Sequence, residues 1–203
     1  MSKVVWGAAA RVGIVVALGF GSTTCGNAVR QGEGTSFLII RAMEAAPGAE
    51  PGEFGGTLLS DVETVVDDVP TIFNDIGRVS FGLGLKDPGP PTAPVTPSPL
   101  QHITVNRYRV TFIRADGRNT PGVDVPYPFD GAFTVTVSGD TEAGFTLVRN
   151  VAKLEPPLLA LVNSVVLIST IAEVTFYGQD QTGRAVTATA RIGIDFGNFG
   201  DPD

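Results

Sequence analysis

Apolar and polar residues alternate with a period of two along most of the chain after residue 34, and turn residues separate the alternating runs. From Val186 to Phe196 every second residue is apolar, and the residues between them are mostly threonine or charged. The run 131–138 ("GAFTVTVS") has the same pattern. Strands of this kind bury one face and expose the other, which favours antiparallel sheets with one solvated side. Two such sheets packed together form a β-sandwich.

Eight runs read as strands and predict an all-β fold, an antiparallel β-sandwich of about eight strands. The runs are 35–44, 56–66, 78–87, 102–116, 131–138, 144–155, 169–180 and 183–197. A proline-rich segment at 87–99 separates the first three from the last five, and either set alone makes a thin sandwich. We therefore interpret 87–99 as a stiff crossover inside one domain, 35–198, followed by a tail at 199–203. A linker between two small domains is the alternative.

The segment 156–169 is apolar almost throughout, and its double proline fits the start of a short helix. If it is buried, it closes the open end of the two sheets. If it is exposed, it offers a surface to a partner or a membrane. Burial is the interpretation that we favour.

The first 24 residues have the pattern of an export signal. Lys3 and Arg11 supply positive charge, 12–20 supplies an apolar core, and the small residues 21–24 follow. The apolar run stops short of the roughly 20 residues that a membrane span needs. The pattern predicts a signal peptide with a signal helix at 1–24 that is cleaved rather than kept.

Cys25 is the single cysteine of the chain and comes directly after this segment. Its position predicts lipid attachment at Cys25, although Ser22 stands where lipoprotein signals have an aliphatic residue. Residues 25–34 then form a flexible tether, and the protein is held at a membrane facing the periplasm or the exterior. Cleavage by the general signal peptidase, after Gly21 or after Ala28, is the alternative and gives a secreted, soluble protein.

The charge of the chain argues against some partners. It has 14 basic and 21 acidic residues, a net charge of −7, and without 1–24 the balance is 12 to 21, or −9. Such a surface repels nucleic acid and anionic lipid headgroups unless a local basic patch intervenes. A single cysteine also excludes an internal disulfide.

Little in the sequence points to catalysis. His102 is the one histidine, no G-x-S-x-G motif occurs, and a zinc site lacks the Cys and His ligands it needs. We therefore predict a non-enzymatic protein with no cofactor and no metal. Two alternatives draw on acidic residues, a calcium-binding module and a hydrolase with a carboxylate pair. These residues are Asp61, Glu63, Asp67, Asp68, Asp75, Asp116, Asp124 and Asp130.

The loop 121–131 ("PGVDVPYPFDG") is the candidate recognition element. Pro126 and Pro128 restrict its backbone and flank Tyr127, and Phe129 follows. Loops that a rigid sandwich holds in place often carry binding sites. The alternative is that Tyr127 and Phe129 fold back and cover the end of the sandwich.

The closing stretch 172–196 ("AEVTFYGQDQTGRAVTATARIGIDF") resembles the last two strands of bacterial immunoglobulin-like domains, with a D-x-x-G turn from Asp180 to Gly183. Asp can cap such a turn and Gly can adopt positive φ. The cysteine pair and core tryptophan of the antibody-type fold are absent, since Trp6 lies in the signal segment. The whole chain resembles predicted bacterial lipoproteins that carry such a sandwich. This resemblance implies a binding or scaffolding module for a protein or glycan of the cell envelope, with a calcium- or glycan-binding adhesion module as the alternative.

Overall fold

Strands with alternating burial dominate the structure, a computed structural model that describes residues 34–200. In this range the strands are β1 (Ser36–Ala46), β2 (Thr57–Asp61), β3 (Thr64–Val66), β4 (Val69–Thr71), β5 (Asp75–Leu85), β6 (Ile103–Ile113), β7 (Phe129–Val137), β8 (Thr141–Val148), β9 (Ile168–Asp180) and β10 (Ala185–Gly197). The short helices are η1 (Pro99–Gln101), α2 (Asn150–Lys153) and η2 (Leu158–Leu161), of which η1 and η2 are 3₁₀ helices. The predicted all-β class is confirmed.

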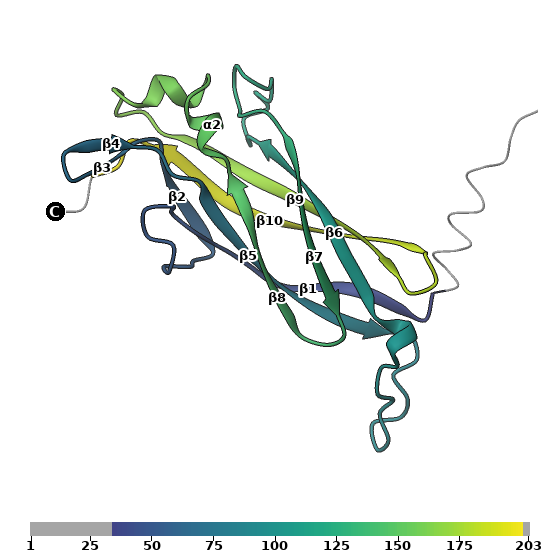
Figure 1. Ribbon diagram of the computed structural model, residues 1–203. Coiled ribbons are helices and arrows are strands. Elements are labelled where there is room, and N and C mark those ends of the chain that lie inside the picture. The colour runs from purple at the N-terminus through teal and green to yellow at the C-terminus, as the bar shows by residue number, and fades with distance from the viewer. Residues whose placement is uncertain (1–33, 201–203) are drawn as a thin grey trace, which may run out of the picture.

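Two sheets form the body of the molecule (Figure 1). One has the strand order β1-β5-β8 and the other β2-β10-β9-β6-β7, while β3 and β4 form a separate small hairpin. The pairs are antiparallel except that β2 runs parallel to β10. Each sheet contains strands from before and after the proline-rich segment 87–99, so hydrogen bonds join both parts of the chain.

Aromatic side chains fill the space between the two sheets. Phe81 of β5 and Phe145 of β8 meet Phe176 of β9 edge-on, with ring centroids 5.1 and 5.4 Å apart. Tyr108 of β6 is also buried, and its Oη donates to the Thr146 carbonyl of β8 at 3.1 Å. Large aromatic side chains dominate core energetics because each removes much apolar area from water. The core therefore holds the three-stranded sheet against the five-stranded one.

The burial along β10 follows the predicted alternation. Its apolar face points into the core, while Thr187, Thr189 and Arg191 on the other face are exposed. The buried apolar side chains on this strand are Val186, Ile192, Ile194 and Phe196. In β7 the apolar side chains are likewise more buried than the threonines between them. The alternation thus correctly predicted which face of these strands is covered.

Two of the predicted strands are interrupted, and these predictions were wrong in detail. The run 56–66 ends as β2 at Asp61, whose Oδ2 accepts from the Thr64 hydroxyl at 2.8 Å, and β3 then turns into the hairpin with β4. Such a side-chain bond offers the backbone a turn in place of the ladder. The run 144–155 ends as β8 at Val148, and α2 follows at 150–153. The expectation of antiparallel pairing throughout was also wrong for β2.

The proline-rich segment 87–99 connects β5 of one sheet to β6 of the other, and it protrudes from the body (Figure 1). The segment is a crossover between the sheets, as predicted, but it folds back on itself, because the Val95 amide donates to the Pro88 carbonyl at 2.8 Å and closes a loop. The apolar segment 156–169 is divided between the core and the surface. Leu158 and Leu161 are buried, whereas Val165 and Val166 are exposed. The predicted burial therefore holds for these two leucines and for Ile168 at the start of β9, but not for Leu159 or for the apolar residues 165–167.

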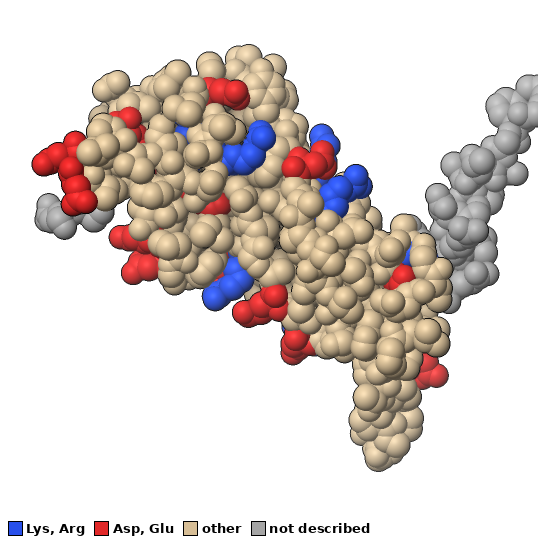
Figure 2. Space-filling view, in the orientation of Figure 1, with Lys and Arg blue, Asp and Glu red and all other residues tan. Residues whose placement is uncertain are grey.

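The start of β1 and the turn between β9 and β10 lie at one end of the elongated molecule (Figure 1). The β3–β4 hairpin and α2 lie at the opposite end. On the face seen in Figure 2, basic and acidic side chains are interspersed, and several of them are neighbours of opposite charge.

Candidate functional site

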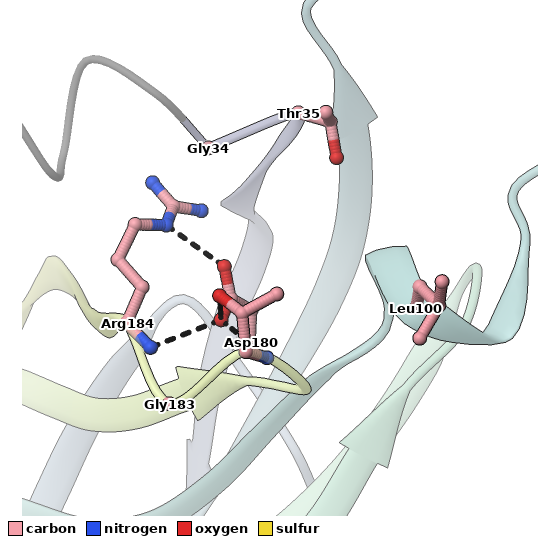
Figure 3. A pocket seen from close by; sticks show the side chains of 7 residues that line it. Gly34, Thr35, Leu100, Asp180, Gly183 and Arg184 are labelled. Atoms are coloured by element: carbon pink, nitrogen blue, oxygen red, sulfur yellow. Dashed lines mark hydrogen bonds and ion pairs between the residues drawn. The ribbon is translucent and has the colours of Figure 1, made fainter.

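A pocket of about 490 Å³ lies where the described chain enters the domain (Figure 3). It is formed by the residues preceding β1, by Leu100 of η1, and by the turn between β9 and β10. Gly34 lies directly against Arg184, and a Cβ at residue 34 would overlap the guanidinium group. This end of the domain is the point at which any segment before residue 34 is attached.

Asp180 organises the turn beside this pocket. Its Oδ1 accepts from the amides of Thr182 at 2.9 Å and Arg184 at 3.0 Å, and its Oδ2 accepts from the Arg184 Nε at 2.8 Å. Gly183 has φ of 80°, a conformation that L side chains rarely adopt. The predicted roles of Asp180 as turn cap and of Gly183 as the positive-φ residue are confirmed.

Neighbouring groups stabilise the ionised form of Asp180. Burial raises the pKa of its carboxyl group, but hydrogen bonds from Thr182 and Arg184 outweigh this effect and lower that pKa from 3.8 to about 2. A carboxyl group with this pKa is ionised at neutral pH and is a poor general acid. The Asp180–Arg184 pair therefore suits a structural task better than proton transfer.

Arg184 joins the two sheets at this end. Its Nη2 donates to the carbonyl of Ser36, the first residue of β1, at 2.6 Å. The side chains of Asp180 and Arg184 are only 6% and 11% exposed, and buried ion pairs are held most firmly when further hydrogen bonds complete them. The carboxylate, the guanidinium and the β1 backbone thus form a clamp at the N-terminal end of the domain, which we call the entry clamp.

The two residues of the predicted recognition loop have different environments. Tyr127 is 51% exposed and lies against Gly122 in the loop. Phe129 is the first residue of β7 and is 9% exposed. Its ring contacts Tyr108 edge-on at 6.2 Å and has the Arg149 guanidinium above it at 4.5 Å. Tyr127 is therefore available for contact with a partner, whereas Phe129 is part of the core.

The acidic residues named as calcium or hydrolase candidates are dispersed among separate partners. Asp116 is held by Arg114 and Arg118, whose hydrogen bonds lower the pKa of its carboxyl group, and Asp130 is paired with Arg109. Asp67 and Asp68 occupy the β3–β4 turn with positive φ. Within residues 34–200 no group of three or more His, Cys, Asp or Glu side chains is placed to hold a metal ion. His102 ends η1 and is half-buried.

One buried ion pair could not be seen in the sequence. Lys153 of α2 and Asp75 of β5 are each 1% exposed, and Nζ lies 3.0 Å from both carboxylate oxygens. The Ser60 hydroxyl and the Gly48 amide also donate hydrogen bonds to the Asp75 carboxylate, at 2.6 and 3.0 Å. Burial raises the pKa of Asp75, and Lys153 opposes this. The partners are 78 positions apart in the sequence, which explains why no local pattern signals the pair.

Cys25 and the predicted signal peptide 1–24 lie outside the described residues. In the part of the chain that is described, no helix is long and apolar enough to cross a membrane. Lipid attachment therefore stays a prediction from the sequence.

No family model matches this chain, and neither a curated protein nor a solved structure is similar enough to count as a match. The case for a function accordingly depends on the residues and contacts of this chain alone.

Proposed function

We propose that this protein is a non-enzymatic exported protein of the cell envelope, lipid-anchored at Cys25, whose domain is an immunoglobulin-like β-sandwich that binds or scaffolds a partner. Two facing sheets over one aromatic core support the assignment to the immunoglobulin-like class. The hairpin of β9 and β10 with its Asp180–Gly183 turn supports it further. The proposed partner is a protein or glycan of the envelope, and membrane contact is made through the lipid.

The observation that carries the proposal is which end of the domain lies next to the predicted anchor. The chain after Cys25 enters the structure at Gly34, beside the entry clamp, and the loops around α2 lie at the far end (Figure 1). A short tether at the clamp end would keep that end nearest the membrane and leave those loops as the part of the domain farthest along from the point of attachment. That orientation suits a protein that presents a binding surface to its surroundings.

The ionisable groups support a binding role over an enzymatic one. Asp180 caps a turn and pairs with Arg184, Asp75 pairs with Lys153, and Asp116 pairs with two arginines. A catalytic acid or base must exchange a proton with a substrate near neutral pH. Carboxylates held in such pairs are structural, so we favour the non-enzymatic reading.

The anchor is tested by replacing Cys25→Ser in the full chain, expressed in a bacterial host, and separating membrane from soluble fractions. We expect the variant to move to the soluble fraction, while Asn27→Ser, a nearby change that keeps the cysteine, stays with the membrane. Mass spectrometry of the N-terminal peptide should show acyl chains on Cys25 in the parent protein. An unchanged distribution of Cys25→Ser, or a mature N-terminal peptide without acyl chains, would contradict the lipid anchor.

The two alternative N-termini, expected from cleavage by the general signal peptidase after Gly21 or Ala28, are Ser22 and Val29. Either one, found without acyl chains, would favour a secreted, soluble protein instead.

A further inference from the structure

A groove of about 410 Å³ lies at the end of the domain opposite the entry clamp, next to α2. It is formed where β7 begins and where β8 ends, at the free edges of the two sheets. Its lining includes Phe129, Asp130, Arg149 and the carboxamide side chains of Asn74 and Asn150. The groove therefore combines an aromatic ring, a guanidinium group and several polar groups.

Arg149 has an unusual environment among the basic residues of the described chain. Its guanidinium lies over the Phe129 ring at 4.5 Å, and its Nε is buried without a hydrogen-bond partner. No carboxylate of residues 34–200 lies within ion-pairing distance of it, whereas Arg109 of β6 is paired with Asp130 at 2.9 Å. A partly buried cation without a counter-ion is unfavourable, and a carboxylate is the group that a guanidinium binds best.

The other polar groups in the groove define what else a ligand should offer. The Asn74 Oδ1 accepts from the Asn150 backbone amide at 2.7 Å, and the Asn150 Oδ1 accepts from the Val151 backbone amide at 2.8 Å. Both carboxamides thus use their oxygens within the protein and keep their NH₂ groups for a ligand acceptor. Asp130 uses Oδ2 for Arg109, so its Oδ1 can accept from a ligand hydroxyl.

These groups together match a sugar acid. A carboxylate would pair with Arg149, ring or hydroxyl oxygens would accept from the two carboxamides, and a hydroxyl would donate to Asp130. An acidic peptide side chain supplies the carboxylate but no hydroxyl for Asp130. The net negative charge of the chain disfavours a polyanion, so one carboxylate among neutral groups fits better than a dense row of them.

We propose that the groove beside Arg149 binds a uronic acid residue of an envelope glycan, with the Arg149 guanidinium holding the carboxylate. This inference deepens the proposed binding function and rests on it, because the ligand is a glycan of the envelope only if the protein is located there. The groove lies at the end of the domain opposite Gly34 and the entry clamp.

The test is a calorimetric titration of the full chain with the methyl glycosides of glucuronic and galacturonic acid. Methyl glucoside and methyl galactoside, which lack the carboxylate, are the matched neutral probes. We expect at least one uronide to bind ten times or more tightly than its neutral counterpart, and we expect added salt to weaken that binding. Failure of both uronides to bind better than the neutral sugars would overturn the proposal without any variant.

Variants then locate the site. Arg149→Gln should weaken uronide binding at least tenfold while the thermal unfolding curve stays cooperative. Arg107→Gln is the control, because Arg107 also stacks on an aromatic ring, Tyr177 at 4.3 Å, but lies outside the groove. Undiminished binding to Arg149→Gln would overturn the proposal. Equally tight binding of N-acetyl-glutamate N-methylamide would do so as well, because it would indicate an acidic peptide.

The outcome of this titration is independent of the test of the anchor. Uronide binding by a protein that is not acylated would support the proposed ligand of the groove and contradict the proposed lipid anchor. An acylated protein that does not bind uronides would support the lipid anchor and contradict the proposed ligand of the groove.

Discussion

Replacing Lys153→Met should be among the most destabilising single changes in this domain. The substitution keeps an unbranched side chain of similar length but removes the cation that faces Asp75. Both side chains are 1% exposed, so the carboxylate left behind has no access to water. Ser60 and the Gly48 amide would remain as its hydrogen-bond donors.

The magnitude follows from the geometry of the pair. Two unit charges 3.0 Å apart attract each other by roughly 5 kcal/mol at an effective dielectric constant of about 20. Much of this attraction is offset by the cost of removing both charges from water, so the intact pair contributes little net stability. Removing one partner leaves the desolvation cost of the other uncompensated, and we expect a loss of about 3–5 kcal/mol in the free energy of unfolding.

Urea unfolding of the full chain at pH 7 measures this loss, with Lys86→Met as the control at an exposed lysine. The double variant Lys153→Met with Asp75→Asn removes both charges and should recover part of the lost stability, by about 1–3 kcal/mol relative to additive effects. A loss below about 1 kcal/mol in Lys153→Met, or strict additivity in the double variant, would refute the reasoning.

Acidification gives a second readout of the same pair. In Lys153→Met, burial would raise the pKa of Asp75 without an opposing cation. A carboxyl group whose folded-state pKa is raised stabilises the protein below its unfolded pKa and loses that effect as the pH rises through its folded pKa. The deficit of the variant relative to the parent should therefore shrink between pH 7 and about pH 4, since Asp75 can then be buried in its neutral form.

Two further predictions concern the β9–β10 turn. Gly183→Val should lower the free energy of unfolding by about 1–3 kcal/mol through backbone strain alone, because φ is 80° there and no atom lies within 4 Å of an added Cβ. Gln181→Val at the same turn is the control and should change the urea midpoint little. Equal midpoints for the two variants would contradict the turn assignment. Asp180→Asn should reduce the acid sensitivity of the domain: the folded-state pKa of about 2 lies below the ordinary 3.8, so this group contributes roughly 2 kcal/mol above about pH 4 that is lost as the pH falls towards 2. Parallel unfolding series from pH 7 to pH 2 should show a flatter profile for Asp180→Asn, and identical profiles would contradict this role of the carboxylate.

The parts of the fold that depend on neighbouring residues could be predicted from the sequence. The alternation in β7 and β10 shows which side chains are apolar on each face, and a strand with one apolar face has a strong reason to bury it. The turn from Asp180 to Gly183 is equally local, because the carboxylate bonds to amides only two and four residues away. Local signals of this kind need no knowledge of the rest of the chain.

The alternation of apolar and polar residues was less informative for segments whose structure depends on contacts with residues far away in the sequence. The run 144–155 continues its apolar residues past Val148, but the structure turns there into α2, which brings Lys153 to Asp75 at the start of β5. The apolar segment 156–169 shows the same difficulty, since Leu158, Leu161 and Ile168 are buried in the core while other apolar side chains of the segment are exposed. Hydrophobicity alone does not say how much room the facing sheet has for each side chain.

The sequence by itself determined the all-β class, the covered face of the clearest strands and the chemistry of the closing turn, because each depends on residues a few positions apart. Tertiary structure alone decided the parallel pairing of β2 with β10, the burial of Lys153 against Asp75, and the position of Arg149 over Phe129. These contacts join segments far apart in the chain, and their free energy depends on which groups the surrounding sheets exclude from water. A lysine and an aspartate look like surface residues in the sequence, and only packing around them makes their charges depend on each other.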